Sequence, residues 1–333
     1  MHTAAPYWLI AFFAAIVLLA LAVDFFLLHK QGAHAVTVKE ALYWSLAWVG
    51  LSLAFNVLFW FAVKGATGDS EQADVHAMAF FTGYLIEKSL AVDNIFIFLM
   101  IFNYFSVPPA YQKRVLIIGI IGAIILRTVM ILIGGWLVAE FHWVMYVFGA
   151  FLLFAGVKTW FALGKRFDLE SNFALKILRR VMPVSDSFDG ERFFTVQQGQ
   201  RMGTPLLLVV AMVGFTDVVF AVDSIPAIFA ITTDPFIVLS SNIFAILGLR
   251  AMFFLLAATA SKFHLLNYGL AVIMLFIGCK MLLIDIVKIP VLVSLAVVVV
   301  VLAITMIWSL RTAPKLRDDG HGQDHEQQPP MLH

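Results

Sequence analysis

The sequence has few charged residues and almost no cysteine, and both shortages exclude broad classes of protein. Charged residues make up 13% of the 333 residues, whereas a soluble domain carries about 25%. The single cysteine, Cys279, excludes an intrachain disulfide and a cysteine-rich zinc or iron–sulfur site. A net charge of +1 argues against a nucleic-acid-binding protein. The composition therefore excludes an ordinary soluble enzyme, a disulfide-stabilised secreted domain and a disordered chain.

What the sequence does contain is long apolar stretches. Hydrophobic residues make up 62% of the chain, and its mean hydropathy is +0.95. A membrane-spanning helix needs about 20 mostly apolar residues. Nine stretches meet this requirement: 7–28, 41–63, 75–102, 115–138, 142–163, 204–230, 236–260, 266–287 and 289–310. Runs such as 291–301 are continuously apolar rather than alternating, which excludes the strands of a membrane β-barrel. The sequence therefore predicts an all-α polytopic membrane protein with about nine transmembrane helices.

The basic residues between these stretches predict the orientation of the chain in the membrane. Lys and Arg gather in cytoplasmic connections. With nine spans and an outside N-terminus, the inside segments hold 15 of the 22 bases and the outside segments hold only two, Lys64 and Lys288. We therefore expect an N-terminus outside and a C-terminus in the cytosol.

These spans divide the chain into six segments. They are an N-terminal two-helix segment (1–74), a first three-helix repeat (75–163), a cytosolic loop (164–203), a second three-helix repeat (204–288), a final helix (289–310) and a disordered cytosolic tail (311–333). Within the loop, residues 169–181 suggest either an amphipathic surface helix or a solvated loop with a short helix. Residues 192–202 suggest a small hairpin that turns near Gln198-Gly199. The tail contains two histidines, His321 and His325, and whether it binds metal stays open.

Two segments of three spans resemble each other in sequence. In each, a carboxylate lies six positions before the aspartate of an Ala-Val-Asp motif. Further matches follow in the same order along the next two spans. The matched pairs are Glu87 with Asp217, Asp93 with Asp223, Asn94 with Ser224, Arg127 with Arg250, Tyr146 with Tyr268, and Lys158 with Lys280. Because three is an odd number, a direct duplication places the second copy upside down in the membrane. Inverted repeats of this kind are typical of secondary transporters.

The two Ala-Val-Asp motifs predict a cation site inside the membrane. Asp93 and Asp223 lie far from the ends of their spans, where a charge costs several kcal/mol unless it is compensated. Asn94 and Ser224 follow them and supply a second oxygen atom each. Pro226 lacks an amide hydrogen, so we expect it to kink or open its helix. Carboxylate, amide and hydroxyl oxygens favour Mg²⁺, Ca²⁺ or Mn²⁺ over metals that prefer thiolates.

Other ionisable residues within the spans have two interpretations. Glu87 and Asp217 lie about 9 Å along a straight helix from the motif aspartates, so they either bind the same cation or lie along its exit path. The remaining groups are expected to form supporting ion pairs, and these are Arg127, Arg250, Lys88 and Asp24. For Asp24, a polar group at the membrane interface is the alternative.

The segments 87–98 (EKSLAVDNIFIF) and 215–250 resemble the TerC family of integral membrane proteins, and within it the Alx branch. The resemblance extends to 190–194 (GERFF) in the loop. It implies a manganese exporter related to the lysine-exporter superfamily, with two three-helix repeats and no permanently bound cofactor. The acids of the family motif fall on Glu87, Asp93, Asp217 and Asp223. The family is also associated with tellurite resistance and with metal supply for secreted enzymes.

The leading hypothesis is therefore a divalent-cation exporter of the bacterial cytoplasmic membrane that works by alternating access and has no catalytic residues. Its expected partners are Mn²⁺ or Ca²⁺ and the lipid bilayer. Two other hypotheses stay open: an intramembrane aspartyl protease, although the sequence has no Gly-x-Gly-Asp motif, and a membrane scaffold that delivers metal to secreted proteins. Metal selectivity, the coupling ion, stoichiometry, self-association and association with the secretion machinery are not determined by the sequence.

Overall fold

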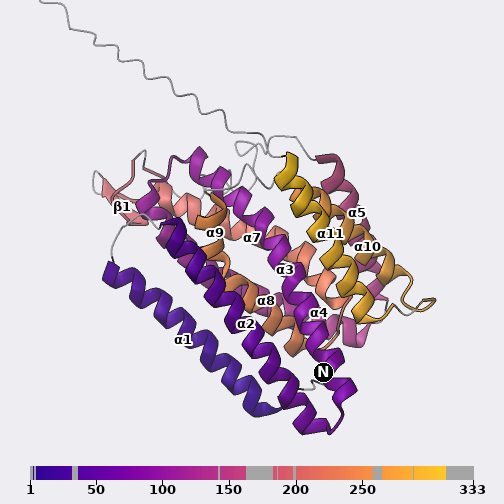
Figure 1. The fold of residues 1–333 in the computed structure, drawn as a ribbon. Helices are drawn as coiled ribbons and strands as arrows, with labels where there is room; N and C mark the ends of the chain where they lie inside the picture. Colours follow the sequence, from indigo (N-terminus) through magenta and orange to yellow (C-terminus); the bar gives the residue numbers. More distant parts are fainter. Residues whose placement is uncertain are drawn as a thin grey trace, which may run out of the picture.

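The computed structural model describes residues 3, 5–31, 37–141, 143–162, 183–185, 187–197, 200–257, 265–287 and 289–312. Helices dominate this part of the chain (Figure 1). They are α1 (Tyr7–Gln31), α2 (Val38–Thr67), α3 (Ser70–Tyr104), α4 (Pro109–Glu140), α5 (Val144–Ala162), α7 (Pro205–Phe229), α8 (Pro235–Leu247), α9 (Leu249–Ala257), α10 (Leu266–Leu282) and α11 (Val291–Thr312). A two-stranded antiparallel sheet, β1 (Phe194–Gln197) and β2 (Gln200–Gly203), lies between α5 and α7.

Each of the nine predicted spans contains helix in the described residues, which confirms a helical membrane protein. Among the described residues, five helices are long and apolar enough to cross a membrane on their own, and the bent pair α8–α9 makes a sixth if it is one span. The apolar parts of α1 and α10 are shorter, at Tyr7–Val23 and Tyr268–Leu282. The count of nine spans therefore stays a prediction.

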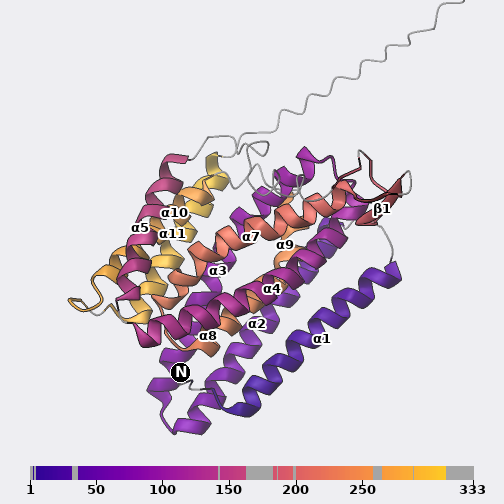
Figure 2. The ribbon, with the colours of Figure 1, turned by 180° about the vertical axis from the view of Figure 1, so that it is seen from behind.

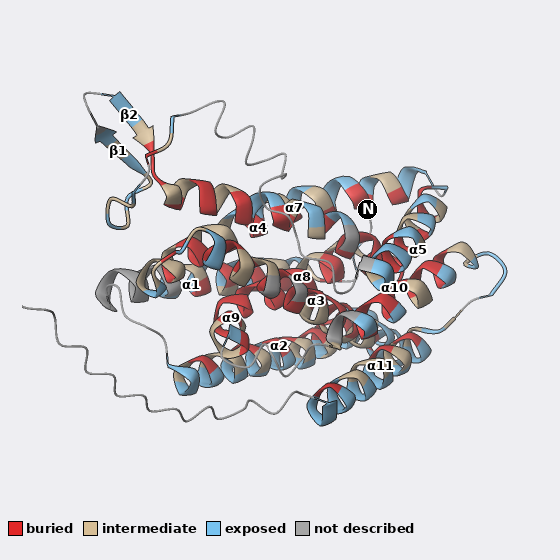
Figure 3. Ribbon diagram, turned by 90° about the horizontal axis from the view of Figure 1, so that it is seen from above, coloured by how far each residue is buried: buried red, intermediate tan, exposed pale blue. Residues whose placement is uncertain are grey.

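The N-terminal helices α1 and α2 lie along one side of the bundle, whereas α5, α10 and α11 gather at the opposite end (Figures 1 and 2). Phenylalanine rings join the two N-terminal helices to α3 and α8. The ring centroids of Phe55 and Phe244 are 4.8 Å apart, and those of Phe13 and Phe236 are 5.6 Å apart. Burial is concentrated on the central helices, whereas α2 and α11 present exposed faces (Figure 3). Apolar residues on these outer faces suit contact with lipid.

Short connections with strong stop signals place the helices that carry the site. Helix α2 ends at Gly68, whose φ of 72° is left-handed and favours glycine. Asp69 then caps α3 by accepting a hydrogen bond from the amide of Glu71 at 2.8 Å. Proline occupies the first turn of α4, α7 and α8, where its missing amide costs nothing. These signals fix where the long central helices begin.

The two predicted repeats interlock helix by helix. Helix α3 packs against α8, α4 against α7, and α5 against α10. The α5–α10 contact depends on small residues: a Cβ atom at Gly149 would lie 3.1 Å from the carbonyl oxygen of Gly278, and one at Gly156 would lie 3.2 Å from that of Ala271. Small residues allow membrane helices to approach this closely. The contact therefore holds the backbones of α5 and α10 against each other.

The expectation that Pro226 opens its helix is wrong, whereas a kink at this position stays a prediction. Helix α7 continues through Pro226 to Phe229, and the amide of Ala230 bonds to the carbonyl of Pro226 at 3.1 Å. Pro226 cannot donate a hydrogen bond to the carbonyl of Val222, so α7 lacks that one bond while the turns on either side continue the helix. The break lies instead in the next span, where α8 and α9 meet at Gly248 at an angle of 43°.

The predicted hairpin in the loop is confirmed. Strand β1 pairs with β2, and Phe194 lies opposite Gly203. Beside it, the Arg114 guanidinium bonds to the carboxylate of Glu191 at 3.0 Å, which ties the hairpin segment to α4. The predicted amphipathic helix at 169–181 and the histidine-containing tail lie outside the described residues.

Candidate functional site

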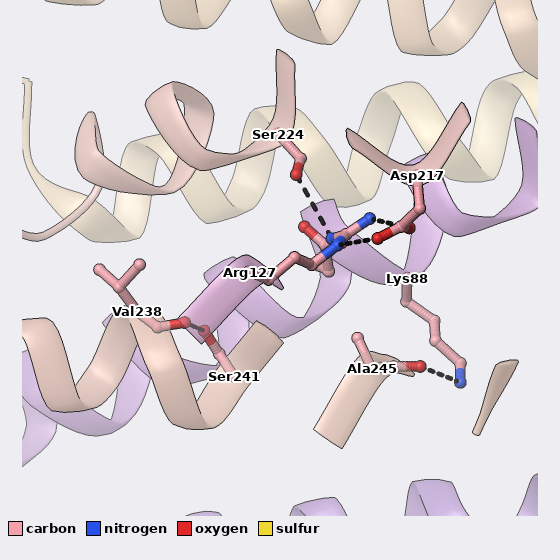
Figure 4. A network of polar contacts seen from close by, with 8 residues as sticks. Lys88, Arg127, Asp217, Ser224, Val238, Ser241 and Ala245 are labelled. Carbon is pink, nitrogen blue, oxygen red and sulfur yellow. Dashed lines mark hydrogen bonds and ion pairs between the residues drawn. The ribbon is translucent and has the colours of Figure 1, made fainter. Parts of the chain in front are cut away.

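Three charged side chains from three helices meet in the interior of the bundle. The guanidinium of Arg127 in α4 donates two bonds to Asp217 in α7, from Nη2 to Oδ1 at 2.9 Å and from Nε to Oδ2 at 3.3 Å. Its Nη1 atom donates to the Oε1 atom of Glu87 in α3 and to the hydroxyl of Ser224 at 3.4 Å (Figure 4). Arg127 therefore bridges both predicted repeats through a single guanidinium.

The three side chains of this cluster are buried. The exposed fraction is 1% for Arg127, 1% for Glu87 and 6% for Asp217. Two carboxylates against one guanidinium leave a formal charge of −1 among the three groups. An uncompensated charge in such a place is costly, so the cluster favours a further positive charge nearby.

Two oxygen atoms beside the cluster lack a hydrogen-bond partner in the described part of the chain. They are Oε2 of Glu87 and Oδ1 of Asn94, and both are buried. Both residues line a cavity of about 10 Å³ that Arg127 and Asp217 also border. A cavity of that size holds about one water molecule. Unbonded buried acceptors are unfavourable, and carboxylate and amide oxygens are donors of the kind that hard cations prefer.

A second cavity, of about 50 Å³, adjoins the same groups from another side. Asn94 and Arg127 line it together with Ser224 in α7, Thr159 in α5 and Met274 in α10. Since Arg127 borders both cavities, its guanidinium lies beside open space as well as beside its two carboxylates.

The motif aspartates are placed by their backbones alone. Asp93 precedes Asn94 in α3, and Asp223 precedes Ser224 in α7, but the two aspartate side chains lie outside the described set, as does that of Asp24 in α1. Among the described residues, no group of three or more His, Cys, Asp or Glu side chains is arranged to hold a metal ion. Six residues were predicted as cation ligands. The structure describes the side chains of four of them, and these lie in or beside the cluster: Glu87, Asp217, Asn94 and Ser224.

The other predicted ion-pair residues are placed differently. In the described part of the chain, Lys88 forms a hydrogen bond from Nζ to the carbonyl oxygen of Ala245 at 3.3 Å, and not an ion pair (Figure 4). Its ammonium lies beside the helix break, because a Cβ atom added at Gly248 would collide with Nζ. Arg250, in α9, is buried. Sequence reasoning did not predict the contact between Lys88 and the helix break. The glycine in the middle of an apolar stretch, Gly248, was the sequence feature that could have indicated it.

Comparison with known proteins now identifies the family. The family model described as "Integral membrane protein TerC family" matches residues 72–316. The chain is 55% identical over 295 residues to the Escherichia coli K12 protein named "Putative membrane-bound redox modulator Alx", covering 89% of this chain and 92% of that one. It is 47% identical over 298 residues to the "Uncharacterized membrane protein STKORF319" of Myxococcus xanthus, covering 90% of each chain. No solved structure matches significantly. The chain belongs to the TerC family of integral membrane proteins.

Proposed function

We propose that the protein exports a divalent cation, first of all Mn²⁺, by alternating access through a site formed by Glu87, Asp93, Asp217 and Asp223 with Asn94 and Ser224. The observation that supports this most directly is the buried cluster with a formal charge of −1 and two unbonded acceptor oxygens beside it. Such a site has a deficit of positive charge that a transported cation would supply.

The chemistry of the donor groups supports a hard cation. The candidate ligands are carboxylate, amide and hydroxyl oxygens, which suit Mn²⁺, Ca²⁺ and Mg²⁺. The ligand set contains no thiolate or imidazole, which Zn²⁺ and Cu⁺ prefer. Selectivity among the hard cations would then depend on the size of the site and the number of its ligands.

The packing of α5 against α10 supports the inverted repeat. In the register that matches Tyr146 with Tyr268, Gly149 corresponds to Ala271 and Gly156 corresponds to Gly278. Exchange of the two repeats therefore converts the Gly149–Gly278 contact into the Ala271–Gly156 contact, and both contacts occur. Such reciprocity is expected of helices related by a two-fold axis in the membrane plane, which is a transporter architecture.

The competing hypotheses fit the cluster less well. A carboxylate dyad of a protease requires two acids that share a proton, whereas Glu87 and Asp217 both bond to a guanidinium. The relatives' name suggests redox modulation, but a chain with one cysteine cannot form its own dithiol–disulfide couple. Under the proposed function, a redox effect would follow from the metal that the protein moves.

Mn²⁺ flux in proteoliposomes tests this proposal. Asp93→Asn and Asp223→Asn remove one carboxylate each and keep the side-chain shape. We expect each change to weaken cation binding at least tenfold, or by about 1.4 kcal/mol, without lowering the melting temperature. Glu71→Gln is the matched control, because Glu71 is exposed in the first turn of α3. Normal flux in both Asp variants would contradict the site, and competition by Ca²⁺, Mg²⁺ and Zn²⁺ would measure selectivity.

A further inference from the structure

We propose that Arg127 is a tethered substitute for the transported cation: its guanidinium occupies Glu87 and Asp217 when no cargo is bound, and this allows the carrier to return empty. The protein would then perform net transport rather than obligatory exchange. This inference rests on the proposed function and adds to it how the transport cycle is completed.

The first support is the position of the guanidinium between the repeats. Glu87 belongs to α3 and Asp217 to α7, and these two acids occupy matching places in the repeats. Arg127 bonds to both, with two parallel bonds to Asp217. A cation carried between the repeats would have to make the same bridge. The guanidinium and the cargo therefore compete for the same carboxylates.

The second support is the available space. The cavity beside Glu87, Asn94 and Asp217 measures about 10 Å³, which admits about one water molecule. A hard divalent cation requires about six oxygen ligands at roughly 2.0–2.6 Å. It cannot bind both carboxylates in that way while the guanidinium stays between them. Cargo binding must therefore displace Arg127.

The third support is a place for the displaced side chain. The cavity of about 50 Å³ borders Arg127 on the side of Ser224 and Thr159. The Nη1 atom of Arg127 is already within 3.4 Å of the Ser224 hydroxyl. A side-chain rotation toward α7 and α10 would release the carboxylates without moving the backbone of α4.

The charges explain why replacement of the cation by the guanidinium matters for the transport cycle. With Arg127 in place, Glu87, Asp217 and the guanidinium carry a net charge of −1. With a divalent cation in its place, the two carboxylates and the cation are neutral together, and the displaced guanidinium keeps its charge of +1 beside Ser224. Without either one, two buried carboxylates are uncompensated, which strongly disfavours a state that must pass through a low-dielectric interior. A carrier that lacks the guanidinium would therefore change conformation only when loaded.

The test compares net flux with exchange in the same proteoliposomes. Radioactive Mn²⁺ uptake is measured into metal-free vesicles and into vesicles loaded with unlabelled Mn²⁺. We expect wild type to work in both, and Arg127→Met to retain exchange while its net uptake falls at least tenfold relative to exchange. Arg127→Lys keeps a tethered charge and should retain part of the net uptake. Arg114→Met, which removes a half-buried arginine of the same helix, should leave the ratio unchanged.

Arg127→Met could lose flux simply because it is unstable. Melting temperatures measured with and without Mn²⁺ distinguish this outcome from a loss of Mn²⁺ binding. We expect Mn²⁺ to raise the melting temperature of Arg127→Met more than that of wild type, because the competitor is gone. An unchanged ratio of net flux to exchange in Arg127→Met would overturn the inference. So would loss of both activities without the larger stabilisation by Mn²⁺. Failure of wild type in both flux assays would instead overturn the proposed function itself.

Discussion

Removal of the Arg127 guanidinium should destabilise the protein far more than removal of the half-buried Arg114 from the same helix. Arg127→Met keeps a long unbranched side chain and deletes the charge. It leaves Glu87 and Asp217, with exposed fractions of 1% and 6%, without their guanidinium partner. Breaking a buried pair from one side costs roughly 3–5 kcal/mol, because the remaining charge is uncompensated.

The expected shift in melting temperature follows from the chain length. An unfolding entropy of roughly 2.1 cal/mol/K per residue over 333 residues gives about 0.7 kcal/mol/K for the whole chain. A loss of about 3–5 kcal/mol then lowers the melting temperature by roughly 4–7 °C. Thermal unfolding of the purified, metal-free protein in detergent, followed by intrinsic fluorescence, measures this shift.

Two control variants separate the charge effect from lost packing. Arg114→Met breaks the ion pair with Glu191, whose two side chains are 36% and 31% exposed, and such pairs contribute about 0–1 kcal/mol. The triple variant Arg127→Met/Glu87→Gln/Asp217→Asn removes the uncompensated charges and should recover most of the loss. If Arg127→Met melts no lower than Arg114→Met, or if the triple variant melts as low as the single one, the reasoning about the buried cluster is wrong.

Three further predictions concern the packing and orientation of the helices. Gly278→Ala should lower the melting temperature, because its Cβ would lie 2.9 Å from the backbone of Leu153 and overpacking costs about 1–3 kcal/mol. Gly122→Ala should not lower it, because Gly122 has open space around it. Equal shifts in the two variants would refute the close contact at Gly278. Gly248→Ala should be less harmful in a Lys88→Met background, since the added Cβ meets the Lys88 ammonium; additive effects in this double-mutant cycle would contradict the contact. A reporter fused after Phe188 should be active on the cytosolic side only, as the distribution of basic residues predicts. Activity on the outer side would contradict the predicted topology.

The sequence alone determined the class of the protein and the location of its acidic motifs. Hydrophobicity over about 20 residues is a local property, so the apolar stretches were visible without any tertiary information, and so was the repeat that matches Asp93 with Asp223. The TerC resemblance came from the same motifs and is confirmed by the match over residues 72–316. Turn residues likewise predicted the hairpin that pairs Phe194 with Gly203.

Tertiary packing decided which groups meet. Arg127 and Arg250 occupied matching positions in the repeats, so the sequence could not tell which one would hold Glu87 and Asp217. The packing of α7 against both α3 and α4 brings Arg127 to both acids, and this depends on helix contacts between residues far apart in the chain. The helix break at Gly248 instead of Pro226 has a similar cause. Helix α7 continues through Pro226, whereas the chain bends at Gly248, where an added Cβ atom would meet the Lys88 ammonium and Trp48. Such effects depend on what lies next to a residue in space, and a single sequence does not contain that information.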